Sequence, residues 1–203
     1  EPCPFPGKLP FVQHAKKAAG GGRGRPSGGQ EWYGNQKFCP REVSSSQHHI
    51  SIAFHDYTLI GYYFSPSLDL DTISKTLHTT LSTVANRNRV ILGGDFNLRP
   101  DSIGFAAVRD ITAAYGLGLR SNPDIPTFYH AKGTSTLDYV FTSESISDVG
   151  CETRKYSISD HAMINVKIKI PRRISSSAHS EEQLKRLDFE RCVKSLTEAN
   201  END

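Results

Sequence analysis

Apolar and polar residues alternate in two stretches of the chain, which predicts half-buried β-strands. Residues 50–54 alternate in this way, and residues 58–64 (TLIGYYF) follow them after a short turn at 55–57. Because the connection is tight, we expect these two strands to form an antiparallel hairpin. The most regular alternation lies in residues 162–170 (AMINVKIKI), and Pro171 ends it.

Two segments instead repeat apolar residues every three or four positions, as amphipathic helices do. Residues 70–86 form the first, which Asp69 or Asp71 can cap. Residues 101–115 form the second, and we expect Gly104 to weaken it. The apolar faces of the two helices consist of Leu70, Ile73, Leu77, Leu81 and Val84, and of Phe105, Val108 and Ile111.

Three further strands are expected at residues 89–93, 136–143 and 149–156, with the stretch GLGLRSNPDIPTF (116–128) as a loop. Strands and helices mix without regular βαβ alternation. The pattern therefore predicts a layered α/β (α+β) sandwich rather than a doubly wound parallel sheet.

The composition divides the chain into four parts. Residues 1–47 are rich in Gly, Pro and Ser and are expected to be irregular, with residues 20–29 as a flexible loop. Residues 48–171 form the predicted core. A Ser-rich linker is expected at 172–180 and an amphipathic helical tail at 181–203, which lies outside the core.

Composition and charge narrow the class of protein only slightly. The four cysteines of this 203-residue chain are scattered, which argues against a zinc site or a disulfide framework and favours an intracellular protein. No apolar run is long enough to span a membrane. Residues 8–41 hold several cations, including Arg23, Arg25 and Lys37, against the single acid Glu31. This segment is a candidate for nucleic-acid binding, although a solvated basic loop is the more common explanation of such a segment.

Candidate chemistry lies at or beyond the ends of the predicted strands. Asp95 and Asn97 follow strand 89–93, Asp138 lies within strand 136–143, and Asp160 and His161 precede the last strand. Each has an ordinary explanation as a turn, an edge-strand acid or a loop. Together, converging carboxylates, an amide and a histidine are what metal-assisted cleavage of a phosphodiester requires, and oxygen ligands suit Mg²⁺.

Three motifs in the same order resemble the endonuclease/exonuclease/phosphatase superfamily. They are GGDFN (93–97), STLDYVF (135–141) and SDH (159–161). The surrounding segments GRPSGG (24–29) and GYYFSPS (61–67) resemble the endonuclease domain of non-LTR retrotransposon polyproteins. The resemblance covers residues 1–170 and implies a four-layer α/β sandwich, incomplete at its N-terminus.

The resemblance implies a role for each matching residue. Asp95 matches the acid that orients or activates water, Asn97 the amide that contacts the phosphate, and Asp138 the carboxylate paired with the catalytic His161. Other matches are Asp160 as a metal-associated acid, Tyr63 (or Tyr62) as a phosphate contact, Glu1 as a metal-binding glutamate or simply the first residue, and Ser159 as a turn residue.

The function implied is a Mg²⁺-dependent endonuclease, with Mn²⁺ as an alternative ion. It would nick DNA in the nucleus and leave a 3′-hydroxyl that primes a neighbouring reverse transcriptase domain. The tail sequence LKRLDFERCVKSL (184–196) resembles the helical connector of such polyproteins. Two alternatives stay open: a phosphatase or ribonuclease of the same superfamily, and a catalytically inactive remnant that at most binds nucleic acid.

Overall fold

The computed structural model describes residues 7–13, 29–38, 40–84 and 89–169. The expected linker and the helical tail at 181–203 lie outside the described residues. The chain divides into two units after Lys169, and all described residues belong to the first unit.

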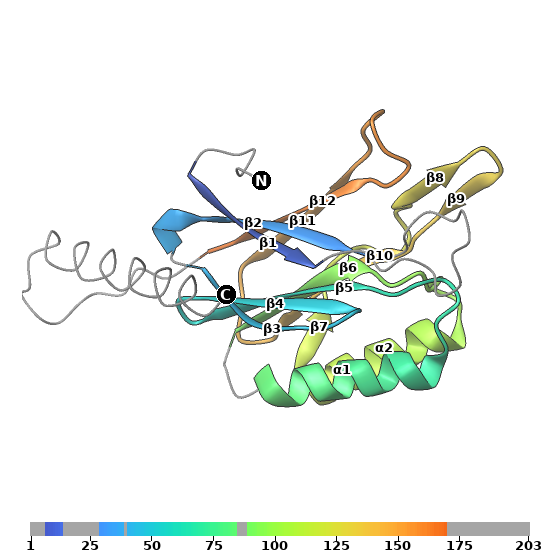
Figure 1. The fold of residues 1–203 in the computed structure, drawn as a ribbon. Helices are drawn as coiled ribbons and strands as arrows, with labels where there is room; N and C mark the ends of the chain where they lie inside the picture. The colour runs from blue at the N-terminus through green and yellow to red at the C-terminus, as the bar shows by residue number, and fades with distance from the viewer. Residues whose placement is uncertain (1–6, 14–28, 39, 85–88, 170–203) are drawn as a thin grey trace, which may run out of the picture. The chain divides into compact units, whose positions relative to one another are not determined.

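A six-stranded mixed sheet forms the centre of this unit, in the order β3-β4-β5-β6-β10-β7 (Figure 1). Only β5 and β6 run parallel, and the other neighbouring strands are antiparallel. The sheet confirms the predicted hairpin of β4 and β5. Its strands are β3 (Arg41–Ser45), β4 (His49–Phe54), β5 (Tyr57–Tyr63), β6 (Val90–Asp95), β7 (Leu117–Leu119) and β10 (Asp138–Ser143).

Two helices, α1 (Leu70–Val84) and α2 (Ile103–Ala114), cover one face of the sheet (Figure 1). A polar side chain caps the N-terminus of each helix. At α1, the Asp69 carboxylate accepts from the backbone N–H of Thr72 at 2.9 Å, and the Ser102 side chain caps α2. The main core lies between these helices and the sheet. It contains Ile60, Tyr62, Phe64, Ile73, Leu77, Leu81, Val84, Val90, Leu92, Phe96, Phe105, Val108, Leu117, Tyr139 and Phe141.

Two antiparallel ribbons lie over the other face, β1 (Lys8–Gln13) with β2 (Gln30–Asn35), and β11 (Val149–Arg154) with β12 (Met163–Ile168) (Figure 1). Val149 and Ile168 pack against Tyr57, Ile91 and Ile146 in a smaller second core. Helices, sheet and ribbons form an α/β sandwich, as predicted. The described residues supply three of its four expected layers.

The expectation that residues 1–47 are irregular is wrong where the structure describes them. β1, β2 and β3 lie in this segment, together with a 3-10 turn, η1 (Gln36–Phe38). Their alternation is hidden because β2 packs through Trp32, whose ring covers Gly61 of β5, while its neighbours are polar. A single aromatic contact therefore replaces the row of aliphatic residues that sequence patterns detect.

The expected loop at 116–128 is also partly wrong. Residues Leu117–Leu119 form β7, an edge strand paired with β10. Phe128 begins β8 (Phe128–His130), which forms a hairpin with β9 (Gly133–Ser135). Three-residue strands are too short to show a period, so only pairing with a neighbour reveals them.

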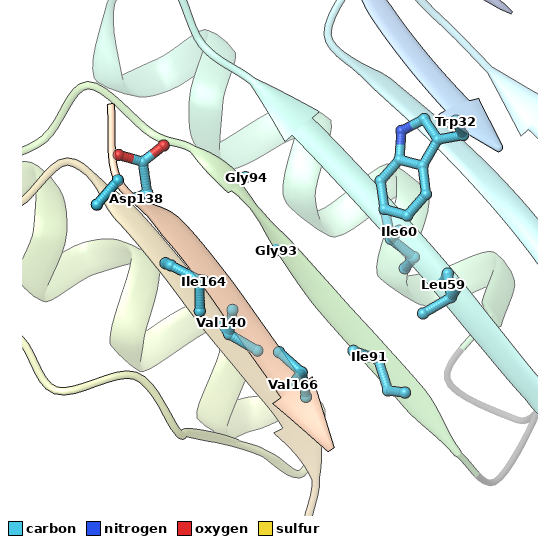
Figure 2. Close-up of a pocket in the computed structure, with 11 residues that line it drawn as sticks. Trp32, Leu59, Ile60, Ile91, Gly93, Gly94, Asp138, Val140, Ile164 and Val166 are labelled. Carbon is cyan, nitrogen blue, oxygen red and sulfur yellow. The ribbon is translucent and has the colours of Figure 1, made fainter. Parts of the chain in front are cut away.

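An apolar groove of about 390 Å³ lies between the central sheet and the two ribbons (Figure 2). Its floor includes Gly93 and Gly94 of β6, and Asp138 lies at one end. The other lining residues are Trp32, Leu59, Ile60, Ile91, Val140, Ala162, Ile164 and Val166.

In the described part of the chain, neither helix is long and apolar enough to cross a membrane.

Candidate active site

Asp95 and Asp138 are brought together by the register of two neighbouring strands. Asp95 is the last residue of β6, Asp138 is the first residue of the antiparallel β10, and the two are directly paired. Directly opposed residues of an antiparallel pair have Cβ atoms only about 5 Å apart. The pairing therefore brings two carboxylates close together where these two interior strands of the sheet meet, at the end of β6 and the start of β10.

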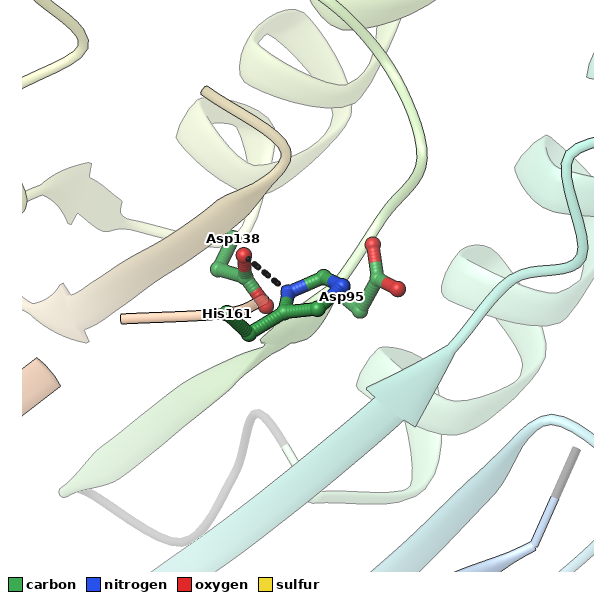
Figure 3. Close-up of side chains that lie close together, drawn as sticks. All are labelled: Asp95, Asp138 and His161. Carbon is green, nitrogen blue, oxygen red and sulfur yellow. Dashed lines mark hydrogen bonds and ion pairs between the residues drawn. The ribbon is translucent and has the colours of Figure 1, made fainter. Parts of the chain in front are cut away.

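His161 completes the cluster from the start of β12. Its Nδ1 lies 2.9 Å from Oδ2 of Asp138, and Figure 3 shows the imidazole ring between Asp138 and Asp95. One ligand atom from each of the three residues lies within 4.8 Å of the others. A short β-bridge between Phe128 and His161 holds the histidine backbone next to β8.

The electrostatics of the cluster favour a proton or a cation between its members. Burial and the negative charge of Asp138 raise the pKa of Asp95 to about 6, although hydrogen bonds from Asn97 and the nearby His161 oppose the shift. Burial disfavours the charged form of His161, but the charge and hydrogen bond of Asp138 and the charge of Asp95 outweigh it and raise the pKa of His161. Two carboxylates this close repel each other when both are ionised. A positive charge on His161 offsets part of this repulsion.

Asn97 holds Asp95 in place. Its backbone N–H donates to Oδ1 of Asp95 at 3.0 Å, and its side-chain Nδ2 donates to Oδ2 at 3.0 Å and to the carbonyl of Phe64 at 2.8 Å. Asn97 has a positive φ of 51°, a conformation that asparagine tolerates better than most residues. Both amide hydrogens are thus used within the protein, and the side chain orients the carboxylate.

Tyr63 lies beside the cluster, whereas Tyr62 does not. Tyr63 pairs with Asp95 across the parallel strands β5 and β6, and burial together with the charge of Asp95 raises the pKa of its phenol. Tyr62 points to the helical side of the sheet and is 2% exposed in the main core. The structure therefore favours Tyr63 over the neighbouring tyrosine as a group at the site.

Asp160 and Ser159 shape the turn before His161. The hydroxyl of Ser159 accepts from the backbone N–H of His161 at 3.0 Å, and the carbonyl of Asp160 accepts from Tyr129 at 2.8 Å. The Asp160 side chain is exposed and is not among the three residues whose ligand atoms meet. Its carboxylate nevertheless contributes to the raised pKa of His161.

Of the basic residues expected to bind nucleic acid, Lys37 is the one that the structure describes, and it lies away from the cluster. Glu1, Arg23 and Arg25 lie outside the described residues. Lys37 is exposed, and its neighbour Phe38 packs against Phe54 and His55 at the β4–β5 turn. That turn and Tyr63 lie at opposite ends of β5, so roughly 20 Å of strand separates Lys37 from the cluster.

Two residues near the cluster were not predicted from the sequence. The buried hydroxyl of Thr127 accepts from the backbone N–H groups of Leu137 and Asp138, both at 3.0 Å, and so fixes the start of β10. The ring of Phe128 lies 4.9 Å from that of His161. Thr127 precedes the β8–β9 hairpin and Phe128 is its first residue. Both lie in a segment expected to be a loop, and no local pattern marks them.

The donor set fits a hard divalent cation. Carboxylate oxygens are the ligands that Mg²⁺ and Mn²⁺ prefer, and imidazole is an additional ligand for Mn²⁺ and related ions. Burial and the charge of Asp138 raise the pKa of Asp95, so a neighbouring positive charge would stabilise its ionised form. Asp95 and Asp138 are the residues that would hold such an ion, with His161 beside them.

A family model described as endonuclease-reverse transcriptase matches residues 57–165. This segment is more than half of the chain and includes all three residues of the cluster. The chain belongs to the endonuclease/exonuclease/phosphatase superfamily. No curated protein sequence matches it.

Solved structures agree with this superfamily fold. The endonuclease domain of TRAS1, a telomere-specific non-LTR retrotransposon, matches with a TM-score of 0.64 and 18% identity over 82% of both chains. An endonuclease/exonuclease/phosphatase family protein from Leptotrichia buccalis matches with a TM-score of 0.54 and 20% identity, over 80% of this chain and 72% of that one. A 3′ phosphatase from Neisseria, bound to a product DNA hairpin, matches with a TM-score of 0.51 and 14% identity over 63% and 66% of the two chains.

Superfamily membership indicates the general class of chemistry to which the fold belongs. The fold is that of nucleases and phosphatases that act on phosphate esters, and nucleases of this superfamily generally depend on a divalent metal. The group of Asp95, Asp138 and His161 provides the acidic and imidazole donors that such an ion needs.

Proposed function

We propose that this chain is a divalent-metal-dependent endonuclease that nicks DNA for a non-LTR retroelement. The observation that carries the proposal is the cross-strand pair of Asp95 and Asp138 with the imidazole of His161 between them. The match to an endonuclease-reverse transcriptase family supports the retroelement context.

Each residue has a part in hydrolysis under this proposal. Water adds to the phosphorus, its proton passes to Asp95, and the P–O3′ bond breaks to give a 5′-phosphate and a 3′-oxyanion, which takes a proton from solvent to become the 3′-hydroxyl. Asp95 is placed to act as this base because Asn97 fixes the orientation of its carboxylate. His161, kept protonated by Asp138, donates to the phosphate. A bound divalent ion would stabilise negative charge on the phosphate and the leaving oxygen.

The remaining predicted residues support this chemistry in the proposal. Asn97 orients Asp95, Tyr63 contacts the phosphate from the neighbouring strand, and Asp160 assists the ion from the adjacent position. The 3′-hydroxyl would prime a reverse transcriptase domain in the same polyprotein. Because the target is chromosomal DNA, we expect the protein to act in the nucleus.

A plasmid-nicking assay tests the proposal. Supercoiled DNA is incubated with the chain and Mg²⁺ or Mn²⁺, and relaxed circles are measured beside the variants Asp95→Asn, Asp138→Asn and His161→Ala. We expect each variant to lose at least about 100-fold in rate, the scale of general acid–base catalysis. His78→Ala is the matched control, since His78 is an exposed histidine of α1 on the helical side of the sheet. Chelation of the metal should abolish nicking.

The reaction products and the cleavage of other substrates distinguish a DNA endonuclease from a ribonuclease, a phosphatase and an inactive remnant. Extension of the nick by a DNA polymerase would support the predicted 3′-hydroxyl. Hydrolysis of only RNA or small phosphomonoesters would instead indicate a ribonuclease or phosphatase. If the unmodified chain cleaves none of these substrates with either metal, the catalytic proposal is wrong and the inactive remnant is favoured.

A further inference from the structure

A nucleic-acid substrate needs cationic contacts beyond the catalytic cluster. Each strand carries a phosphate about every 3.4 Å along the helix axis, and most of the affinity of DNA-binding proteins comes from neutralising such phosphates. Asp95 and Asp138 add negative charge at the cluster itself, and Lys37 lies far from it. The cations near His161 are therefore candidates for holding the strand.

Lys155 is a lysine in a fixed position close to His161. It follows β11, and its Nζ lies 4.1 Å from the centroid of the Tyr129 ring. The Tyr129 hydroxyl donates to the carbonyl of Pro126 at 2.9 Å, and its backbone N–H donates to Asp160 at 2.8 Å. The aromatic platform under the ammonium is thus anchored at both ends, so the ammonium is positioned in advance.

The charge of Lys155 is available to a ligand. The preceding residue, Arg154, is committed to Glu152 through two hydrogen bonds of 2.8 and 3.0 Å. Within the described part of the chain, no ion pair to a carboxylate is found for Lys155, and the side chain is exposed. An ammonium on an aromatic ring keeps its outer hydrogens free to donate to a phosphate oxygen.

The ribbon geometry shows which phosphate Lys155 can reach. Phe128 contacts the ring of His161, and Tyr129 is the next residue of β8, so its side chain points to the opposite flank. Lys155 therefore lies across the hairpin from His161, one residue along β8 from Phe128. A phosphate bound by Lys155 is for this reason a neighbour of the phosphate at His161 and not that phosphate itself.

We infer that Lys155, held on the ring of Tyr129, binds a DNA backbone phosphate that flanks the phosphodiester cleaved at His161. This inference rests on the proposed function, because it assumes that the strand is bound at the cluster. Lys155 is a positioning residue that holds the strand in register with the three catalytic side chains.

The salt dependence of DNA binding tests the inference. Anisotropy of a fluorescein-labelled duplex is measured over a range of NaCl concentrations in the His161→Ala background, where the substrate stays intact. Lys155→Gln should weaken binding several-fold and lower the slope of log K against log [salt] by about 0.9, the value of one phosphate contact. Lys155→Arg should retain the slope, and Tyr129→Phe should retain affinity because the ring remains. Lys75→Gln, in an exposed helical pair with Asp71, is the matched control and should change neither.

The effect on turnover separates positioning from a structural role. With His161 present, Lys155→Gln should raise KM for plasmid nicking and leave kcat within about twofold, as expected for lost uniform binding. An unchanged salt slope for Lys155→Gln, or equal weakening by Lys155→Arg, would overturn the inference while leaving nicking intact. If the chain shows no salt-dependent DNA binding in any form, both this inference and the proposed function are wrong.

Discussion

At the scale of single residues, Asn97 links backbone conformation to chemistry. Its positive φ turns the chain directly after β6, and this turn lets its amide reach back to Asp95 and across to the carbonyl of Phe64. Phe96, between them, is fully buried in the main core. The Asn97 side chain therefore links the Asp95 carboxylate to the backbone of Phe64, a residue of the main core.

Two substitutions separate these roles of Asn97. Both Asn97→Gly and Asn97→Ala remove the amide, so we expect each to lower the nicking rate about tenfold or more by leaving Asp95 unsupported. Only alanine is strained at this φ, so Asn97→Ala should be about 1 kcal/mol less stable than Asn97→Gly in urea unfolding. Nicking by Asn97→Gly at the unmodified rate would show that the amide has no part in the chemistry.

His49 is a second residue whose environment has a measurable consequence. It is 8% exposed at the start of β4, where the hydroxyl of Ser46 lies 2.7 Å from its Nδ1. Burial and the neighbouring His48 lower its pKa, and Glu42 only partly opposes the shift. The folded protein therefore binds a proton at His49 less readily than the unfolded chain does.

This shift predicts that acid destabilises the fold through His49. Its contribution is constant above the ordinary pKa of 6.5 and is lost as the pH falls below that value toward the lowered pKa, by up to about 1.4 kcal/mol per pH unit. Urea unfolding at several pH values should show a shallower pH dependence for His49→Gln than for the unmodified protein. The exposed His78→Gln control should keep the original dependence, and an equal change in both variants would contradict the assignment.

At the scale of elements, Gly94 sets the spacing between the parallel strands β5 and β6. It has a φ of 146°, and a Cβ atom built on it would lie 2.0 Å from the carbonyl oxygen of Tyr62. The neighbouring Gly93 has ordinary contacts of 3.4 Å at the same position. Of the two glycines before Asp95, only Gly94 is therefore required for the strands to pair.

Alanine substitutions at the two glycines should differ sharply. Gly94→Ala must push β5 and β6 apart or bend the strand, so we expect a loss of about 3 kcal/mol or more in the free energy of unfolding. Gly93→Ala should cost less than about 1 kcal/mol, because its new methyl group meets only van der Waals neighbours. Thermal unfolding of both variants tests this, and similar melting temperatures would contradict it.

The elements that the sequence predicts well are those with a long period and a buried face. Helix α1 and strands β4, β5 and β12 each repeat apolar residues over several positions, and all formed where expected. Strands β2 and β7 were missed because their stability comes from Trp32 and Leu117 packing on distant residues. The local strand propensity of a segment does not depend on such long-range contacts and therefore cannot reveal them.

The three residues of the cluster could be selected from the sequence, but their geometry could not. Motif spacing identified Asp95, Asp138 and His161, yet no pattern reveals that the first two face each other across β6 and β10. Strand register depends on pairing between segments far apart in sequence. For the same reason the supporting roles of Thr127, Phe128 and Tyr129 became apparent only in the folded chain.

At the scale of the whole described unit, the three side chains of the cluster come from regions that differ in how well they are packed. Asp95 and Asp138 belong to adjacent strands of the central sheet, which packs on the main core. His161 comes from the start of a two-stranded ribbon that contacts the smaller core. Regions with fewer buried contacts open at lower free energy than the core does.

We therefore expect nicking activity to disappear before the sheet unfolds. In urea, the midpoint for loss of activity should lie at least about 0.5 M below the midpoint followed by far-UV circular dichroism, given typical slopes of about 1–3 kcal/mol per molar. Activity that recovers fully on dilution would show that the loss is local and reversible. Coincident midpoints would mean that the ribbon and the sheet unfold as one unit.

The order of the three side chains along the chain also has a consequence during synthesis. Helix α1 and the hairpin of β4 and β5 are complete once residue 84 has been made, and both carboxylates are present after residue 138. The histidine that lies between them follows only at residue 161, near the end of the described unit. A chain still attached to the ribosome therefore carries every strand of the central sheet once residue 143 has been made. The imidazole of the cluster follows roughly 1–4 s later, at about 5–20 residues per second.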